Sequence, residues 1–455
     1  MASNRREFLN LAVGMGLSVA FQQNLTIGAS RADAAPIAPN PDDPNDPNAI
    51  LDPDHEIGKA YVGWKEGELD LHFISTGVGE SAFHIYPDGT TMLLDAGDWN
   101  IQGYKDRVRT VPNDSKRAGE WIARYISRLR PELETIDYVM ASHFHSDHTG
   151  CADAGVGMKG LEGDADYMIS GISHVAEFYR FGTAFDRGYP TYDKPTTWAP
   201  KEREPLVKFW NYAEKNLGLK REEFVVGALD QIKLLREPSK YDFHIRNLCR
   251  NGAVWQGDER GVVDYFERYP DNKKTNQNEN TRSLAFLLRY GAFRFYTGGD
   301  ASGTLRDDKG KDVDFEGSIG RAAGPVDVCK ANHHSYKDAM TKTFVNAVQA
   351  RAYVVCVWDR WHLQDVTASN MCDDSATGYP GPRVMCPTQI HKGNAEMMQG
   401  KAWRDRLVEC GGHVVVKAYD GGAKYKIYYL THDDESMTVK LVFGPFESKN
   451  VGDKI

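Results

Sequence analysis

A histidine-rich segment in the first half of the chain places the strongest constraint on its fold. Residues 142–150 read SHFHSDHTG, so three histidines and one aspartate fall within six residues. The apolar run at 135–141 predicts a buried strand that ends where this segment begins, and α/β folds place their chemistry at such sheet edges. Imidazole nitrogens and carboxylate oxygens are ligands that suit zinc and comparable divalent ions. The segment therefore predicts a metal site.

Four such ligands cannot all reach one ion comfortably when they lie so close along the chain. We expect His143 and His145 to bind one metal ion, and Asp147 and His148 to bind a neighbouring one. A surface loop that is histidine-rich by chance would rarely have this spacing. The segment therefore predicts two divalent ions as cofactors, with zinc as the first choice and manganese or iron as the alternatives.

The segment HFHSDHTG resembles the signature of the metallo-β-lactamase superfamily, whose members are mostly hydrolytic metalloenzymes with a four-layer αββα fold. The resemblance implies an α+β or α/β fold of this kind, a metallo-β-lactamase sandwich with an elaborated insertion. Upstream, a strand pattern at 69–73, a G-x-G-x-S turn and the sequence LLDAGD are similar to the opening of many such domains. There Asp95 would brace the metal loop, because a metal-bound histidine needs a partner for its other nitrogen. A helix or turn cap is the equal alternative for Asp95.

Two later blocks narrow the resemblance to one branch of the superfamily. They read NTRSLAFLLRYGAFRFYTGGD, ending in Asp300, and VDVCKANHHS, containing His333 and His334. Both resemble the branch that holds the extracellular hydrolase domain of DNA-uptake competence channels and the bacterial phosphorylcholine esterases, with Ser335 where glycine is usual. The resemblance implies that Asp300 bridges the two metals. Because neighbouring strand residues point to opposite faces, we expect His334 to be a ligand and His333 a substrate contact or proton carrier, with the reverse left open.

One further metal ligand is expected from the superfamily, since many members use another histidine between the first motif and the bridging aspartate. His174, at the end of a strand predicted at 166–173, is the best placed candidate, and His244 is the second. The competence-channel branch often lacks this ligand, so a structural role for His174 is the alternative. Asp147 and His333 are the candidate catalytic residues, because one of them would manage proton transfer.

Residues 1–34 look like an export signal. Paired arginines, Arg5 and Arg6, precede a weakly apolar stretch, and the sequence Ala32-Asp33-Ala34 offers a small-x-small cleavage site. These features resemble a twin-arginine signal peptide, which carries proteins already folded, often with their metal installed. They predict a periplasmic or secreted bacterial protein, with the twin-arginine export machinery as a partner. An ordinary amphipathic helix is the alternative.

The rest of the chain divides into a linker and one domain. Residues 35–60 are rich in proline, aspartate and asparagine, which is typical of a linker. Residues 61–455 are interpreted as a single metallo-β-lactamase-fold domain. A long section without a family match, at about 175–278, is interpreted as an insertion over the metal site, with a separately folded insert as the alternative. No later run is long and apolar enough to span a membrane.

The net charge of the chain indicates which class of substrate it could bind. The formal net charge is −9, and it becomes −10 without residues 1–34, which carry three arginines and two acidic residues. Nucleic-acid binding depends on lysine and arginine contacts, so this acidic chain disfavours a nucleic acid as the partner. The branch resemblance implies a small-molecule substrate, a phosphodiester or phosphate ester. A lactone, β-lactam or other carboxyl ester is the alternative, and a non-catalytic metal-bearing binding protein is the least favoured.

Two features are left with open interpretations. The seven cysteines include no CxxC pair, and Cys372 with Cys386 is the first choice for a disulfide, while buried thiols are the equal alternative. The segment WDRWH at 358–362 would either line the pocket or pack as an aromatic corner.

Overall fold

The computed structural model describes the greater part of the chain after the predicted linker. The described residues are 54–99, 106–150, 158–159, 167–192, 200–270, 277–303, 305–373 and 383–449. The predicted signal peptide at 1–34 lies outside them, as does the predicted linker up to residue 53. In the part of the chain that is described, no helix combines the length and apolar character needed to cross a bilayer.

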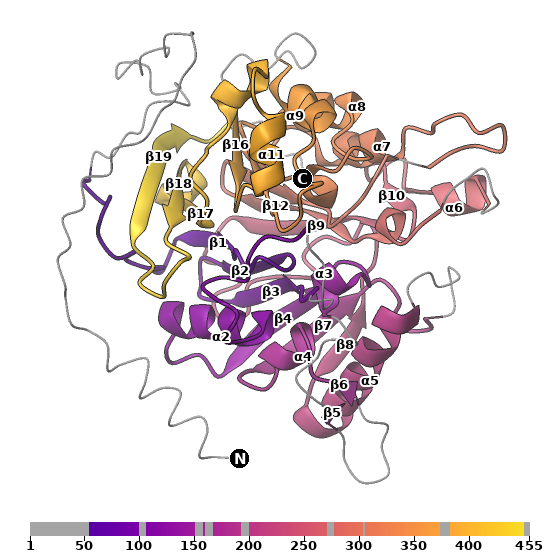
Figure 1. The fold of residues 1–455 in the computed structure, drawn as a ribbon. Helices are drawn as coiled ribbons and strands as arrows, with labels where there is room; N and C mark the ends of the chain where they lie inside the picture. The colour runs from indigo at the N-terminus through magenta and orange to yellow at the C-terminus, as the bar shows by residue number, and fades with distance from the viewer. Residues whose placement is uncertain are drawn as a thin grey trace.

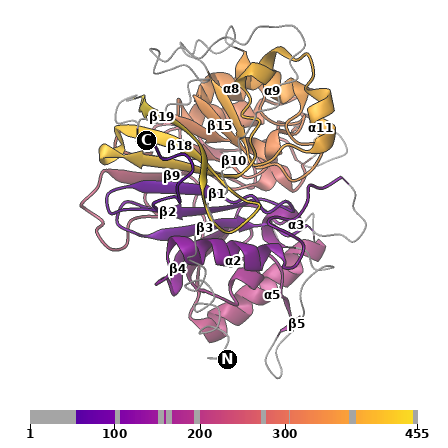
Figure 2. The ribbon, with the colours of Figure 1, turned by 60° about the vertical axis from the view of Figure 1, so that its left-hand side comes forward.

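Two mixed β-sheets pack face to face, and helices cover their outer faces (Figures 1 and 2). In Figure 2, α2 (Ala118–Leu129) and α5 (Pro200–Leu217) lie beyond one sheet. On the far side of the other sheet lie α8 (Lys342–Val348), α9 (Asp365–Cys372) and α11 (Lys392–Met397). This order of helix, sheet, sheet and helix is the four-layer sandwich that the sequence predicted.

The first sheet has nine strands in the order β19-β18-β17-β1-β2-β3-β4-β7-β8. Strands β3, β4, β7 and β8 run parallel to one another, and the remaining neighbours are antiparallel. The strands are β1 (Leu69–Phe73), β2 (Ser81–Ile85), β3 (Thr91–Ala96), β4 (Thr135–Ala141), β7 (Arg180–Asp186), β8 (Lys220–Glu223), β17 (His413–Tyr419), β18 (Lys424–Leu430) and β19 (Val439–Glu447).

The second sheet has eight strands in the order β11-β10-β9-β12-β13-β14-β15-β16, and it is parallel from β13 to β16. The strands are β9 (Phe243–Arg250), β10 (Ala253–Trp255), β11 (Val262–Asp264), β12 (Ala285–Tyr290), β13 (Phe293–Thr297), β14 (Val328–Lys330), β15 (Ala352–Val355) and β16 (Val384–Pro387). A separate short pair joins β5 (Met158–Lys159) to β6 (Tyr167–Met168).

The remaining helices are short. They are α3 (Ser146–Thr149), α4 (Ile172–Val175), α6 (Tyr265–Arg268), α7 (Phe315–Ala323) and the 3-10 turns η2 (Asn280–Arg282), η3 (Asn332–Ser335), η4 (Ala402–Arg406) and η5 (Asp420–Gly422). The helix expected at 115–130 is present as α2, and its Trp121, Ile122, Tyr125 and Ile126 are buried, as their three- and four-residue spacing requires.

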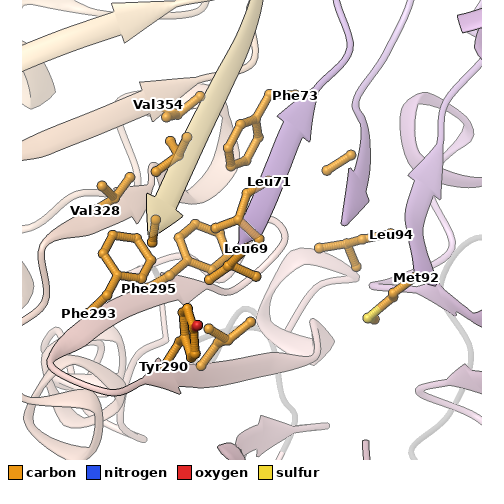
Figure 3. Close-up of a cluster of buried hydrophobic side chains, with 14 of the residues drawn as sticks. Leu69, Leu71, Phe73, Met92, Leu94, Tyr290, Phe293, Phe295, Val328 and Val354 are labelled. Carbon is orange, nitrogen blue, oxygen red and sulfur yellow. The ribbon is translucent and has the colours of Figure 1, made fainter. Parts of the chain in front are cut away.

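The main hydrophobic core fills the space between the sheets (Figure 3). Leu69, Leu71 and Phe73 of β1 face Phe293 and Phe295 of β13, and the rings of Phe73 and Phe295 meet edge to face at 5.9 Å. Residues on both faces of β1 are buried, because the sheet meets its partner on one side and helices on the other. This core fixes the two sheets to each other and so fixes the ends of their strands.

The segment interpreted as an insertion, about 175–278, contributes strands to both sheets. Its β7 and β8 extend the first sheet next to β4, and its β9 pairs with β12 within the second sheet. These strands pack into the sandwich rather than forming a body of their own. The end of β7 therefore lies beside the end of β4, which leads into the histidine motif, while β12 separates β9 from the β13 strand that leads to Asp300.

The cysteines form no disulfide among the described residues. Cys249, Cys329, Cys356 and Cys386 are buried free thiols, and no disulfide joins Cys372 to Cys386. The predicted Cys372–Cys386 disulfide is therefore wrong, and the alternative of buried thiols describes Cys386 correctly. Cys386 lies in β16, where its side chain belongs to the core between the sheets.

Candidate metal centre

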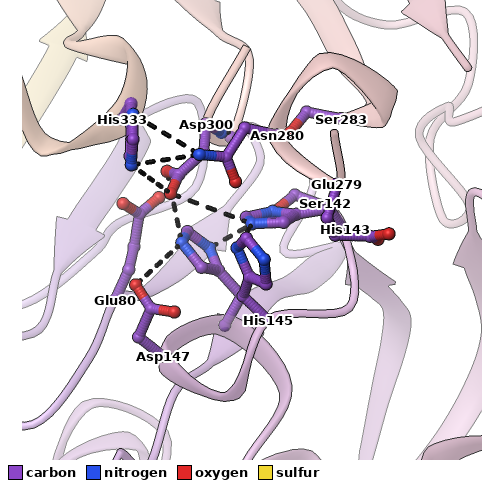
Figure 4. Close-up of polar contacts among 12 residues, drawn as sticks. Glu80, Ser142, His143, His145, Asp147, Glu279, Asn280, Ser283, Asp300 and His333 are labelled. Atoms are coloured by element: carbon purple, nitrogen blue, oxygen red, sulfur yellow. Dashed lines mark hydrogen bonds and ion pairs between the residues drawn. The ribbon is translucent and has the colours of Figure 1, made fainter. Parts of the chain in front are cut away.

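Strand ends from both sheets bring the predicted ligands together. β4 ends at Ala141, directly before the histidine motif, and Asp147 and His148 lie within the short helix α3. From the second sheet, Asp300 follows β13 and the two adjacent histidines follow β14. Figure 4 shows His143, His145, Asp147, Asp300 and Glu80 converging on one small region.

One group of ligand atoms surrounds His148. Its Nε2 lies 3.2 Å from Asp300 Oδ1, 3.4 Å from Asp147 Oδ2 and 3.3 Å from His334 Nε2. Asp147 Oδ2 also lies 3.0 Å from His334 Nε2. All four side chains are buried. Separations near 3 Å are what atoms ligating one ion require, because each would lie about 2.1 Å from the metal.

A second group shares Asp300 with the first. His143, His145 and Asp300 have ligand atoms that lie within 4.8 Å of one another. His143 Nε2 is 3.1 Å from His145 Nδ1 and 3.8 Å from Asp300 Oδ2. His145 is half-buried and the other two side chains are buried. Asp300 thus faces both groups, which is the geometry of the bridging carboxylate that the resemblance implied.

The donor set fits divalent metal ions. Asp300 Oδ1 is buried and accepts no hydrogen bond, so a cation would satisfy an atom that the protein leaves unsatisfied. Negatively charged side chains also outnumber lysine and arginine side chains around Asp300. Four buried carboxylates, those of Glu80, Asp95, Asp147 and Asp300, accompany one buried ammonium, that of Lys330. Such a concentration of negative charge needs compensating positive charge, which protonated His148 and His334 supply without metal and which two divalent ions would supply in their place.

The ionisation of the cluster follows from these charges. Burial opposes ionised Asp300, but the charges of His148 and His334 outweigh burial and hold the pKa of Asp300 well below its usual range. Burial likewise opposes a charged His148, yet Asp300 and Asp147 raise its pKa well above the ordinary value. The pKa of His334 rises to about 9 for the same reason, with Asp300 as the main cause opposing burial. The cluster therefore attracts positive charge strongly.

Hydrogen bonds from the far side of the rings orient two of the histidines. His148 Nδ1 lies 2.8 Å from Asp95 Oδ2, and Asp95 also accepts hydrogen bonds from the backbone N–H and hydroxyl of Ser142. His334 Nδ1 lies 2.9 Å from the carbonyl oxygen of Cys356. Each Nδ1 donates in this arrangement, which leaves Nε2 as the metal-facing atom. The bracing role predicted for Asp95 is confirmed.

Glycine turns hold the metal loop against the first sheet. The N–H of Glu80 donates to the Asp147 carbonyl oxygen at 2.8 Å, and the N–H of Gly97 donates to the Glu80 carbonyl oxygen at 2.8 Å. A Cβ on Gly97 would lie 1.8 Å from the Asp147 oxygen, and one on Gly79 would lie 2.7 Å from it. Only glycine allows this approach, which explains why the G-x-G-x-S and LLDAGD segments precede the motif.

His333 and His334 differ from the prediction in their backbone. They do not continue a strand, because β14 ends at Lys330 and the chain enters the η3 turn. His333, His334 and Ser335 have φ angles of 45°, 50° and 60°, so the rule of opposite faces does not apply. His334 lies in the buried ligand group as expected, while His333 Nε2 lies 3.8 Å from Asp300 Oδ2. Both histidines face the site.

Ser335 stands in this turn where the related branch usually has glycine, and its left-handed backbone costs an L-residue about 1 kcal/mol. Its hydroxyl donates to Thr367 Oγ1 at 2.6 Å, a bond that contributes about 1 kcal/mol. We therefore expect Ser335→Gly to change the free energy of unfolding by less than about 1 kcal/mol, and Ser335→Ala to destabilise by about 1–2 kcal/mol. Urea denaturation measures both, and equal stability of the two variants would contradict strain at this position.

His174 does not join either ligand group. The strand predicted at 166–173 is reduced to the two residues of β6, and the helix α4 that follows turns His174 towards α2. Its ring stacks obliquely on Phe178 at 5.9 Å, and its charged neighbours are Glu120, Glu177 and Arg117. His244, the second candidate, lies on β9 and bonds to Asp230 at 2.8 Å. Neither histidine is placed to bind the metals, and the structural role left open for His174 fits its position.

We expect His174→Ala to keep the full metal content of the unsubstituted protein. The substitution should lower the free energy of unfolding by about 1 kcal/mol, through lost packing against α2. Elemental analysis of the purified protein measures metal content, with His145→Ala as the control that loses metal. A His174→Ala protein as depleted as His145→Ala would restore His174 to the ligand set.

Two charged residues at the site were not predicted from the sequence, Glu80 and Lys330. Glu80 belongs with His148, Asp300 and His334 in a buried group that could hold a metal, and its carboxylate pairs with Lys330 at 2.7 Å. A sequence signal existed for both. Each is a charged residue directly beside a strand predicted to be buried, and such a charge needs a buried partner.

The WDRWH segment packs behind His334. The imidazole of His362 stacks on that of His334 at 4.4 Å with an interplanar angle of 17°, and Trp358 meets His362 edge to face. Trp358 and His362 are buried, whereas Trp361 is 42% exposed. The aromatic-corner interpretation therefore describes Trp358 and His362, which fix the ring of His334 in place.

One comparison with known protein families agrees with part of this architecture. Residues 75–156 match the family model described as Metallo-beta-lactamase superfamily, and this range includes the histidine motif and the turns that hold it. The fold is a metallo-β-lactamase fold. Two solved structures with some likeness to the chain are a mutant of CmlA beta-hydroxylase and CmlA itself, a diiron beta-hydroxylase from Streptomyces venezuelae.

The likeness to these two structures is low. Sequence identity is 11% and the TM-score is 0.36 for both. The matched region covers 71% of this chain and 53% of the other, so the chain corresponds to about half the length of these proteins. No curated protein matches the chain significantly. The assignment of a metallo-β-lactamase fold therefore rests on the matched segment and the two-sheet architecture.

Proposed function

We propose that this protein is an exported metal-dependent hydrolase that cleaves a small phosphodiester or phosphate ester. The observation that carries the proposal is the position of Asp300 between two groups of histidines. Its Oδ1 lies 3.2 Å from His148 Nε2 and its Oδ2 lies 3.8 Å from His143 Nε2. A carboxylate shared in this way is suited to hold two divalent ions side by side.

Two bound divalent ions would supply an activated water and would neutralise charge on the substrate. The side chains of this protein do the rest. Asp95 and the Cys356 carbonyl keep His148 and His334 in the ligating orientation. His333 is 18% exposed, and its Nδ1 lies 2.6 Å from Asp338 Oδ1, while its Nε2 lies 3.1 Å from Asn280 Nδ2 and 3.8 Å from Asp300 Oδ2. His333 is therefore the side chain best placed to exchange a proton with a bound substrate.

The choice of a phosphate ester rests on the motif resemblance and on charge. The blocks ending in Asp300 and Ser335 are similar to those of phosphate-ester hydrolases. A net charge of −10 without residues 1–34 favours a small substrate over a nucleic acid. Zinc is the proposed metal, with manganese or iron as alternatives, because histidine and carboxylate ligands suit all three.

The test is hydrolysis of bis(p-nitrophenyl) phosphate by the purified chain without residues 1–34, loaded with zinc or manganese. Metal-dependent turnover that disappears in His145→Ala would support the proposal. Turnover of lactones or β-lactams, with none of the phosphodiester, would establish the carboxyl-ester alternative. No turnover of either class by a protein with two bound metals would favour the non-catalytic binding protein, and turnover that needs a reductant and oxygen would overturn hydrolysis.

The proposed location outside the cytoplasm depends on Arg5 and Arg6. Fusion of residues 1–34 to a reporter that is exported only in the folded state tests it directly. Replacement of both arginines by lysine should keep the reporter in the cytoplasm, because the twin-arginine route recognises the arginine pair. Export that persists in the doubly substituted fusion would remove this part of the proposal.

A further inference from the structure

A buried ion pair lies directly beside the second ligand group. Glu80 and Lys330 are 2% and 1% exposed, and Glu80 Oε2 lies 2.7 Å from Lys330 Nζ. Lys330 also donates to the Gly299 carbonyl oxygen at 2.7 Å, and its Nζ lies 3.9 Å from Asp300 Oδ1. The ammonium therefore lies between Glu80 and the bridging carboxylate.

Glu80 is close enough to ligate. One of its carboxylate oxygens lies within 4.8 Å of ligand atoms of His148, Asp300 and His334. Glu80 Oε2 lies 3.4 Å from His334 Nδ1, so the carboxylate now contacts that ring on the side turned away from the metal. Its backbone is fixed on both sides by hydrogen bonds to Asp147 and Gly97, so only the side chain can move. A free carboxylate in this position would add a ligand to the second metal, which Asp147, His148, Asp300 and His334 already surround.

We propose that Lys330 is a positioning residue that holds Glu80 off the second metal ion and so keeps one coordination position open. The ammonium forms an ion pair with Glu80 Oε2 and donates a hydrogen bond to the Gly299 carbonyl oxygen, which holds both groups beside β14. Catalytic metal sites keep an open position for water or substrate, while closed sites are structural. With the ion pair, the acidic cluster binds metal tightly and keeps one coordination position open. Without it, Glu80 would fill that position. The inference needs a dinuclear centre, but it does not depend on the substrate class.

Substitutions of the two partners should act in opposite directions. Lys330→Met removes a positive charge and frees Glu80 to ligate, so affinity at the second site should rise by about 10–100-fold. Glu80→Gln leaves the ammonium without its partner 3.9 Å from Asp300 Oδ1, so affinity should fall by about 10–100-fold. Glu80→Gln with Lys330→Met should return close to the unsubstituted affinity.

The experiment is stepwise loading of the metal-free protein with cobalt(II), monitored by visible absorption and by competition with a chelator. The intensity of cobalt absorption falls as coordination number rises. Lys330→Met should therefore show weaker absorption at the second site, while Glu80→Gln and the double variant keep the absorption of the unsubstituted protein. Lys417→Met is the matched control, because Lys417 is a buried lysine paired with Glu68 and with Asp70, the latter at 3.0 Å. That control should leave cobalt binding unchanged.

Two outcomes would overturn the inference. If Glu80→Gln alone changes the absorption, then Glu80 is already a ligand in the unsubstituted protein. If Lys330→Met folds and binds cobalt with unchanged absorption and affinity, then the ammonium does not restrain Glu80. Should Lys330→Met fail to fold, Lys330→Gln takes its place in the same cobalt titration, and unchanged absorption and affinity in that variant would equally overturn the inference. Because the readouts are cobalt binding and absorption, a failed phosphodiesterase assay leaves this test intact.

Discussion

Asp300→Asn is expected to abolish the dinuclear centre. The asparagine amide is neutral and cannot bridge two cations, so metal content should fall from two ions to one or fewer for each chain. Metal ions contribute several kcal/mol of charge stabilisation in the transition state, so the proposed hydrolysis should slow by about 1,000-fold or more, equivalent to about 4 kcal/mol. Elemental analysis and steady-state kinetics on the variant measure the two effects.

Asp95→Asn is the matched control for this substitution. Asp95 is also a buried aspartate at the end of a strand, but it contacts His148 through Nδ1, on the side of the ring away from Asp300. The loss of such an outer partner typically costs about 10–100-fold in metal affinity or activity. The assignment of Asp300 would fail if its variant kept both metals, or if the two variants lost affinity and activity to the same degree.

The candidate metal ligands were predictable wherever the signal is local in the sequence. The spacing of His143, His145, Asp147 and His148 along one loop defines them without any knowledge of the fold. Asp300 and His334 each follow a predicted strand, and parallel strands of one sheet end at the same edge. The two-sheet core between them was also predictable, because β1 and β13 read as buried strands.

Other parts of the site depend on contacts that no local pattern reveals. Glu80 lies directly before β2 of the first sheet and Lys330 lies in β14 of the second, so their pairing appears only when the sheets pack together. The orientation of His333 depends on three consecutive left-handed residues, which a strand pattern does not predict. His174 was proposed as a ligand by its position in the chain, but α4 directs it to α2 instead.

The section at 175–278 illustrates the same difficulty. Its lack of family motifs suggested an insertion over the metal site, yet its strands are members of both sheets. Family motifs mark ligands and glycine turns, whereas sheet strands require only apolar residues of suitable shape. The strands of this section were therefore hidden from motif-based interpretation, and so was the role of the loop after β7.

That loop supplies Arg187, which forms a buried ion pair with Glu279 beneath the histidine motif. Arg187 Nε and Nη2 each lie 2.6 Å from a Glu279 oxygen, and both residues are 2% exposed. Glu279 Oε1 also accepts the backbone N–H of Phe144 at 2.9 Å, and the guanidinium lies 4.4 Å from the centre of the Phe144 ring. Phe144 separates His143 from His145, so the pair fixes the backbone that carries both ligands.

Arg187→Met is therefore expected to destabilise the protein by about 3–5 kcal/mol, because Glu279 would remain buried without its partner. Metal affinity at the site of His143 and His145 should fall as well, whereas the site of His148 should be less affected. Urea denaturation and stepwise cobalt loading measure these effects. Arg187→Met with Glu279→Leu should recover much of the lost stability, since no buried charge remains, but not the hydrogen bond to Phe144.

An ion pair on the surface serves as the control that distinguishes the effect of burial on stability from the effect of charge alone. Arg306 and Asp312 form an ion pair at 3.0 Å, and their side chains are 49% and 76% exposed. Asp312→Asn should change the free energy of unfolding by less than about 1 kcal/mol, because solvent screens exposed pairs. If Arg187→Met cost no more than this surface substitution and left cobalt binding intact, the buried pair would have no part in holding the metal loop. A large loss of stability with unchanged cobalt affinity would limit its role to the fold.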